Sequence, residues 1–133
     1  MNTLKTMQLC RISFGIAAWI FAICIIAQVL LTGLALFINP VNWIYHVNFA
    51  RFFFILPLLM AILAYFAQLQ KKIIWQSIGL FGMVIALFFT AAISARFAII
   101  GVLHPVIALV LFWGCIKLLP PYKPNSEINK FSS

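Results

Sequence analysis

Acidic side chains are almost absent from this chain. Its 133 residues include nine Lys or Arg and a single acid, Glu127, and only 8% of the residues are charged. A soluble domain carries about a quarter of its residues as charges, so this composition excludes a surface that faces water on all sides. One acid cannot supply paired carboxylates, a carboxylate metal cage or a buried Asp/Glu proton relay. Glycosidase, metalloprotease and aspartate-based pump chemistry are therefore excluded within this chain.

Cysteine is also scarce and carries no recognisable spacing. The three cysteines, Cys10, Cys24 and Cys115, show neither a disulfide framework nor a metal-binding pattern. We expect them to stay reduced and to serve as small apolar side chains.

Apolar residues, by contrast, make up 66% of the sequence and form four long runs. A helix needs about 20 mainly apolar residues to cross the hydrocarbon core of a bilayer. The predicted spans cover residues 12–38, 44–69, 73–95 and 99–119. The runs are continuous rather than alternating, which argues against a barrel. The sequence therefore predicts an all-α membrane protein, a four-transmembrane-helix bundle with up-down-up-down topology, in one domain of residues 1–119. The polar tail of residues 120–133 is expected to be flexible and cytoplasmic.

Basic residues predict the orientation of the bundle. Seven cations fall on the side that holds both termini, namely Lys5, Arg11, Lys71, Lys72, Lys117, Lys123 and Lys130. Only Arg51 and Arg96 fall elsewhere, so the positive-inside rule places both termini in the cytoplasm. The first apolar run is too long for a signal peptide and is interpreted as a retained helix. Trp43 and Tyr45 then belong to the outer aromatic belt.

On the inner side, Trp75 and Tyr122 are expected to form the matching aromatic belt. The net charge of +8 is explained by topology and by attraction to anionic lipid, and no nucleic-acid-binding motif is present.

Small and polar residues predict how the helices pack. In the first span they recur at spacings of three and four, at Ala17, Phe21, Cys24, Gln28, Thr32 and Ala35. In the third span, Gly79, Gly82 and Ala86 form a run that permits close approach, with Thr90 and Ser94 further along. Gln28 is interpreted as an interhelical hydrogen-bonding residue rather than a ligand contact.

His46 and His104 are the only histidines, and both lie near the outer ends of spans that run in the same direction. One histidine from each of two helices is the minimum needed to hold a haem iron axially, and bundle cores are common places for such sites. Each has an apolar face below it, with Phe49, Phe53 and Met60 in the second span and Ala108, Leu111 and Cys115 in the fourth. His46 and His104 are therefore candidate haem b ligands.

Two arguments favour purely structural roles for the histidines. Pro105 pushes the preceding residue out of helical geometry, which makes His104 a cap-like position. From His46 to Leu69 is about 35 Å of helix and from His104 to Pro120 about 24 Å, so level inner ends would leave the imidazoles about 10 Å apart in depth. Two axial ligands must be nearly level.

Arg51 and Arg96 lie in the outer half, where an arginine is costly unless it is paired or faces a cavity. No acid nearby can neutralise them. Their expected partner is a lipid phosphate, a haem propionate, another anionic ligand or a carboxylate on another subunit, and snorkelling to headgroups is the alternative. Arg51 follows His46 by about 140° around the helix, so the two share a site only if they flank a broad ligand.

No other motif indicates catalysis. The sequence has no phosphate loop, no nucleophile with a nearby base and no Cys/His cluster of metal spacing. The segment from Gln28 to Phe37, then His46, then Leu103-His104-Pro105-Val106 resembles a family of small bacterial four-span membrane proteins catalogued as a domain of unknown function. That resemblance implies the fold and a bacterial inner membrane, and it implies no activity.

Two hypotheses about function follow, with a third behind them. The first is a haem-binding protein with an electron-transfer or redox-accessory role, using His46 and His104 as ligands and Arg51 or Arg96 for the propionates. The second is a structural or assembly subunit, in a larger complex or a homo-oligomer, whose arginines pair with acids of a partner. The third is a binding or transport protein for a small anion or lipid.

Overall fold

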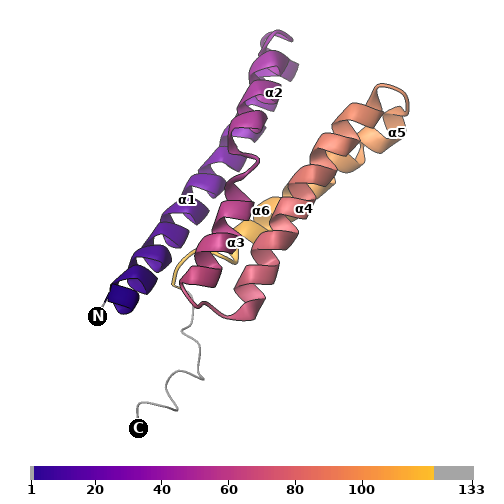
Figure 1. Ribbon diagram of the computed structural model, residues 1–133. Helices are drawn as coiled ribbons and strands as arrows, with labels where there is room; N and C mark the ends of the chain where they lie inside the picture. The colour runs from indigo at the N-terminus through magenta and orange to yellow at the C-terminus, as the bar shows by residue number, and fades with distance from the viewer. Residues whose placement is uncertain (1, 122–133) are drawn as a thin grey trace.

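The four predicted spans form a bundle of antiparallel helices, confirming the all-α fold and the up-down-up-down order (Figure 1). The computed structural model describes residues 2–121. The elements are α1 (Asn2–Phe37), α2 (Asn42–Phe53), α3 (Leu56–Phe66), α4 (Lys71–Ser94), α5 (Ala98–Gly101) and α6 (Leu103–Ile116). The chain is thus a multi-pass membrane protein whose four spans are α1, α2 with α3, α4, and α5 with α6. Residues 122–133 of the predicted tail, which include Tyr122, lie outside the described residues.

Prolines interrupt the second and fourth spans. Pro57 lies in the first turn of α3 and supplies no N–H, so the helical ladder breaks at Phe54 and Ile55. Pro105 likewise lies in the first turn of α6, after a one-residue break at Val102. The expectation that His104 is cap-like is wrong, because α6 begins at Leu103 and His104 is already helical. First-turn N–H groups lack helical partners in any case, so Pro105 costs nothing there.

Helix α3 ends three residues before the predicted boundary at Leu69. Gln68 adopts a left-handed conformation with φ of 50°, and the Leu69 N–H donates to the Ala64 carbonyl at 3.0 Å. This closes the helix end in the manner of a Schellman-type cap. The turn that follows brings α4 back alongside α3.

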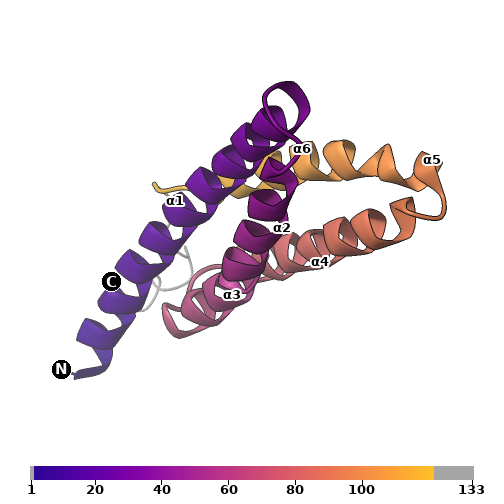
Figure 2. The same ribbon diagram turned by 90° about the horizontal axis from the view of Figure 1, so that it is seen from above.

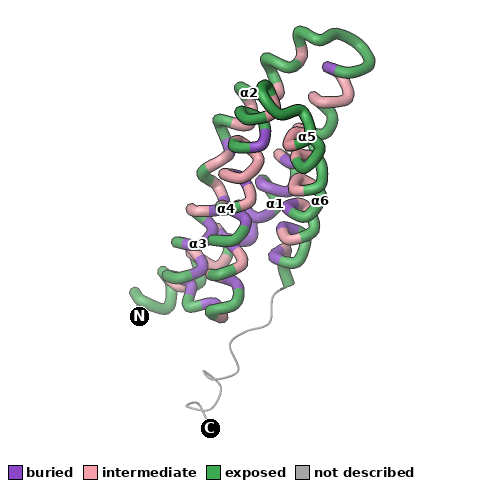
Figure 3. Tube along the Cα trace, turned by 90° about the vertical axis from the view of Figure 1, so that its right-hand side faces the viewer, coloured by how far each residue is buried: buried purple, intermediate pink, exposed green. Residues whose placement is uncertain are grey.

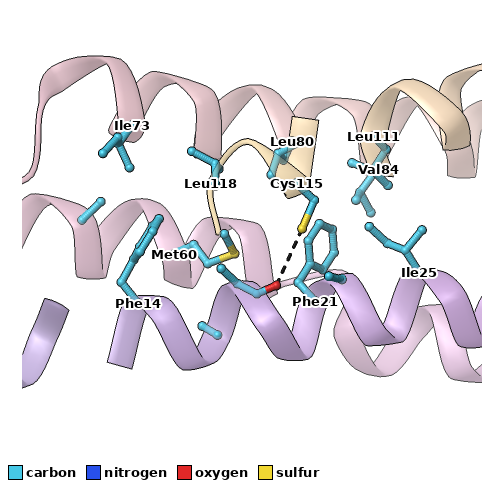
Figure 4. Packing of buried hydrophobic residues seen from close by; sticks show 14 of the residues in the cluster. Phe14, Phe21, Ile25, Met60, Ile73, Leu80, Val84, Leu111, Cys115 and Leu118 are labelled. Carbon is cyan, nitrogen blue, oxygen red and sulfur yellow. Dashed lines mark hydrogen bonds between the residues drawn. The ribbon is translucent and has the colours of Figure 1, made fainter. Parts of the chain in front are cut away.

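The apolar core lies in the half of the bundle where α1, α3, α4 and α6 all meet (Figure 4). Its largest fully enclosed side chains include Phe14, Phe21, Met60, Leu80 and Leu118. The Cys115 thiol is buried there and donates to the Ala18 carbonyl at 3.7 Å. Figure 3 shows the buried residues along the facing sides of the helices, with the two turns at the far end largely exposed. All three cysteines are free, as expected.

The other half of the bundle is more open. Here α2 packs closely on α1 and makes no comparable contact with α4, α5 or α6. Seen from above, the α1–α2 pair and the α4–α6 pair diverge toward their turns (Figure 2). We call the end with the α1–α2 and α4–α5 turns the turn end. The N-terminus and the α3–α4 turn lie at the opposite end (Figure 1).

The predicted packing face of α1 is confirmed, whereas that of α4 is wrong at its two glycines and right at Thr90. Ala17, Phe21 and Ala35 are buried on α1 as expected. On α4, however, a Cβ added at Gly79 or Gly82 would meet no other atom within 4 Å, so both glycines face away from the bundle. The buried residues of α4 are Ile73, Ser77, Leu80, Val84 and Thr90, and of these only Thr90 was expected. Small size alone did not identify the interface, because large side chains fill the space between α4 and its neighbours.

The close approach between helices occurs at Gly114 of α6, where an added Cβ would lie 2.9 Å from Leu80 Cδ2. Leu80 is only 2% exposed and has little room to move. We expect Gly114→Val to destabilise the detergent-solubilised protein by about 1–3 kcal/mol through overpacking. Gly82→Val is the matched control and should leave the thermal unfolding midpoint unchanged. Equal midpoints for the two variants would contradict this packing.

Candidate functional site

The two histidines face one another across the open half of the bundle. His46 lies near the start of α2 and His104 in the first turn of α6, and their ring centroids are 6.4 Å apart with 55° between the ring planes. The expected depth difference of about 10 Å is therefore wrong. It assumed that the two helices are level at their inner ends, but helix tilt and the place where each chain turns are set by packing, not by apolar length.

Helix α2 is held on α1 by polar contacts as well as by packing. Gln28 Nε2 donates to the His46 carbonyl at 3.1 Å, which confirms the predicted interhelical role of Gln28. Near the turn, Asn42 Nδ2 donates to the Leu34 carbonyl at 3.2 Å. Asn39 Oδ1 accepts from the Val41 N–H at 2.9 Å and orders the turn itself. These bonds fix the height of His46 against α1.

The His46 ring nitrogen Nδ1 is anchored to α1. It lies 3.3 Å from the Gln28 carbonyl oxygen and 3.1 Å from the Thr32 hydroxyl. The Thr32 hydroxyl in turn donates to the same Gln28 carbonyl at 3.0 Å. A threonine that donates to the carbonyl one turn back is free to accept a hydrogen bond from the imidazole.

His104 repeats this arrangement on the other helix pair. Its Nδ1 lies 3.1 Å from the Leu87 carbonyl oxygen and 3.2 Å from the Thr90 hydroxyl, both on α4. Thr90 donates to the Leu87 carbonyl at 3.0 Å. In each of the two helix pairs, α1–α2 and α4–α6, one histidine is thus held by one threonine hydroxyl and one main-chain carbonyl.

These contacts favour one position for the ring proton. A carbonyl oxygen only accepts hydrogen bonds, so the contacts with the Gln28 and Leu87 carbonyls favour a proton on Nδ1 and a lone pair on Nε2 in both neutral histidines. Neither Nε2 hydrogen-bonds to the part of the chain that the structure describes. Because Nε2 lies across the ring from Nδ1, each lone pair points away from the helix that anchors its ring. Two such nitrogens cannot bond each other, and each can donate electrons to a metal.

Aromatic and apolar side chains surround the histidine pair. The Trp43 ring meets the His46 ring edge-on at 5.5 Å between centroids. Toward the core, Phe54 and Phe88 bridge the two helix pairs at 6.2 Å. The predicted faces below each histidine are confirmed as buried or half-buried, with Phe49, Phe53 and Met60 on one side and Ala108, Leu111 and Cys115 on the other.

Arg51 and Arg96 both have exposed side chains. Arg51 lies on α2 and Arg96 in the turn between α4 and α5, and residues 2–121 contain no acid that could pair with them. Neither contacts a histidine ring in the described structure. Their anionic partner stays a prediction.

Sequence analysis missed the threonines as part of the site and assigned them to packing. Thr32 precedes His46 by 14 residues, and Thr90 precedes His104 by the same 14. That repeated Thr-x13-His spacing was the available signal. The 13 residues between each threonine and its histidine include the end of one helix, a turn and the start of the next helix. The histidine therefore lies at the same depth in the bundle as its threonine.

No described group of three or more His, Cys, Asp or Glu side chains is placed to hold a metal ion. Structural and catalytic zinc sites use three or four protein ligands. The histidine pair alone falls short of that number.

Comparison with known proteins gives a family and no function. Residues 28–95, just over half of the chain, match a protein family of unknown function (DUF6220). The match includes His46 and both threonines and ends before His104. No curated protein and no solved structure matches the chain.

Proposed function

Because the chain belongs to the DUF6220 family, whose function is unknown, we propose a role from geometry: it binds haem b through His46 and His104 and serves in electron transfer or as a redox accessory. One observation carries this proposal. Two imidazoles from different helix pairs face each other with Nδ1 protonated and Nε2 available.

The separation of the rings supports one shared iron. An imidazole nitrogen binds a first-row metal at about 2 Å, and the ring centroid lies about 1 Å behind that nitrogen. Two imidazoles on opposite sides of one metal therefore have centroids about 6 Å apart. The observed distance is 6.4 Å.

The number of protein ligands also supports haem. A porphyrin supplies four nitrogens in a plane, so the protein needs to supply only the axial ligands. The sequence has no Cys-x-x-Cys-His segment for covalent attachment, which favours haem b. When bound, the group would cycle between ferric and ferrous iron.

The protein side chains in this proposal have distinct tasks. The two histidines would hold the iron from both sides, which would leave no open position for a substrate and favours electron transfer over catalysis. The anchored Nδ1–H groups orient the rings and raise the basicity of Nε2. Trp43 packs against the His46 ring, and the Phe54–Phe88 contact closes the gap between the helix pairs on the side toward the core. Arg51 and Arg96 provide cations in the same half of the bundle for the two propionates, which would relieve the shortage of acids.

Pigment is the direct test. Protein purified in mild detergent from haem-replete cells is expected to show a Soret band, one haem per chain by the pyridine haemochrome assay, and a sharp α band on reduction. Acidic acetone should extract the haem, as expected for haem b. A colourless protein that also fails to take up added hemin would contradict the proposal and leave the assembly-subunit hypothesis as the stronger one.

A further inference from the structure

The histidine pair lies close to one face of the membrane. His46 is about 6 Å of helix from the start of α2 at Asn42, and His104 is about 9 Å from the start of α5 at Ala98. From His46 to the end of α3 at Phe66 is about 30 Å. The pair is therefore at the turn end of the bundle (Figure 1).

The opposite half offers no second redox group. Its interior is filled by apolar side chains, with Phe14, Met60, Leu80 and Leu118 essentially inaccessible. The buried Ser77 hydroxyl is occupied by the Ile73 carbonyl of its own helix at 3.0 Å. Within residues 2–121 there are no histidines besides the pair and no cluster of metal ligands. The rate of electron transfer falls steeply with distance, so we expect no fast electron transfer through this half of the bundle.

The turn end, by contrast, has a thin aromatic cover. Trp43 contacts the His46 ring edge-on and is itself 40% exposed. The α4–α5 turn, which belongs to the same end of the bundle, exposes Phe97 at 59%. A carrier in the water at this face thus comes within one side chain of an axial ligand.

Resting on the proposed function, we infer that this site exchanges electrons at one membrane face only, the turn end, with a water-soluble one-electron carrier. The step moves one electron between the carrier and the iron, with no bond made or broken. The cations Lys5, Arg11, Lys71, Lys72 and Lys117 gather at the opposite end. By the positive-inside rule, the exchanging face is extracytoplasmic.

Sided reduction in proteoliposomes tests this inference. Ile38→Cys places a thiol at the α1–α2 turn, where the native side chain is 76% exposed. Labelling of the apoprotein with an impermeant maleimide then measures the fraction of molecules whose turn end faces outward. Wild-type protein is the background control. Dithionite added outside is an anion that crosses lipid slowly. The amplitude of fast haem reduction is expected to equal the labelled fraction.

The outcomes separate this inference from the proposed function. Fast reduction of all the haem, or an amplitude that follows the unlabelled fraction, would overturn one-sided exchange while leaving haem binding intact. Reduction by a short-chain quinol but not by dithionite from the turn end would place the carrier in the lipid and also overturn it. Protein that binds no haem in detergent overturns both proposals.

Discussion

The double variant His46→Ala/His104→Ala is expected to lose the Soret band completely, because it removes both imidazoles that are proposed to bind the iron. Each single variant should retain haem with weaker affinity and change from a low-spin six-coordinate to a high-spin five-coordinate spectrum. Absorption and electron paramagnetic resonance spectra of the purified variants measure this change. The prediction follows from the 6.4 Å separation of the rings, which lets one group meet both.

Loss of haem by a variant that has simply unfolded is excluded by two controls. Imidazole added to either single variant should restore the low-spin spectrum, because it refills the vacated position. Asn42→Ala removes another bond between α1 and α2, from Asn42 to the Leu34 carbonyl, without touching a ligand. It should keep the wild-type spectrum. Purely structural histidines would give variants that imidazole does not rescue.

Thr32→Val and Thr90→Val are expected to weaken haem binding by about 10-fold each, the lower end of the usual cost of losing a hydrogen-bond partner of a metal-bound histidine, because the main-chain carbonyl still accepts from Nδ1–H. Valine matches threonine in shape but cannot accept from Nδ1–H. Its substitution should make Nε2 a poorer donor to ferric iron. The reduction potential should therefore rise. Hemin titration and a redox titration measure the two effects.

The serine variants provide the matched test. Thr32→Ser and Thr90→Ser keep the hydroxyl and should restore affinity and potential toward wild type. Thr6→Val removes a hydroxyl that donates only to Asn2 in an exposed part of α1 and should change neither quantity. If the two threonines serve only in packing, valine would leave the potential unmoved.

The organisation of the bundle followed from local sequence properties. Apolar run length predicted four spans, and the 3.6-residue period predicted the faces below His46 and His104. Gln28 was expected to bond between helices and does so through the His46 carbonyl. These properties depend on one helix at a time, so the sequence alone carries them.

Several features of the site depended on how helices lie against one another. Gly79 and Gly82 were expected at an interface and face outward, while Gly114 makes the close approach instead. Composition does not indicate which face of α4 packs against the other helices, because α4 carries apolar side chains on all of its faces. The histidines were expected at different depths for a similar reason, since apolar length leaves tilt undetermined.

By itself, then, the sequence determined that this protein crosses the membrane four times. It also predicted that most of the cations lie at one end, and that two histidines lie at the other end, where no acidic side chain is available to neutralise Arg51 and Arg96. Only the tertiary structure decided that His46 and His104 meet, and that Thr32 and Thr90 orient them with their Nε2 atoms available. The physical reason is that lipid is as apolar as the helix surfaces, so hydropathy drives insertion but does not choose partners. Close packing and a few interhelical hydrogen bonds make that choice.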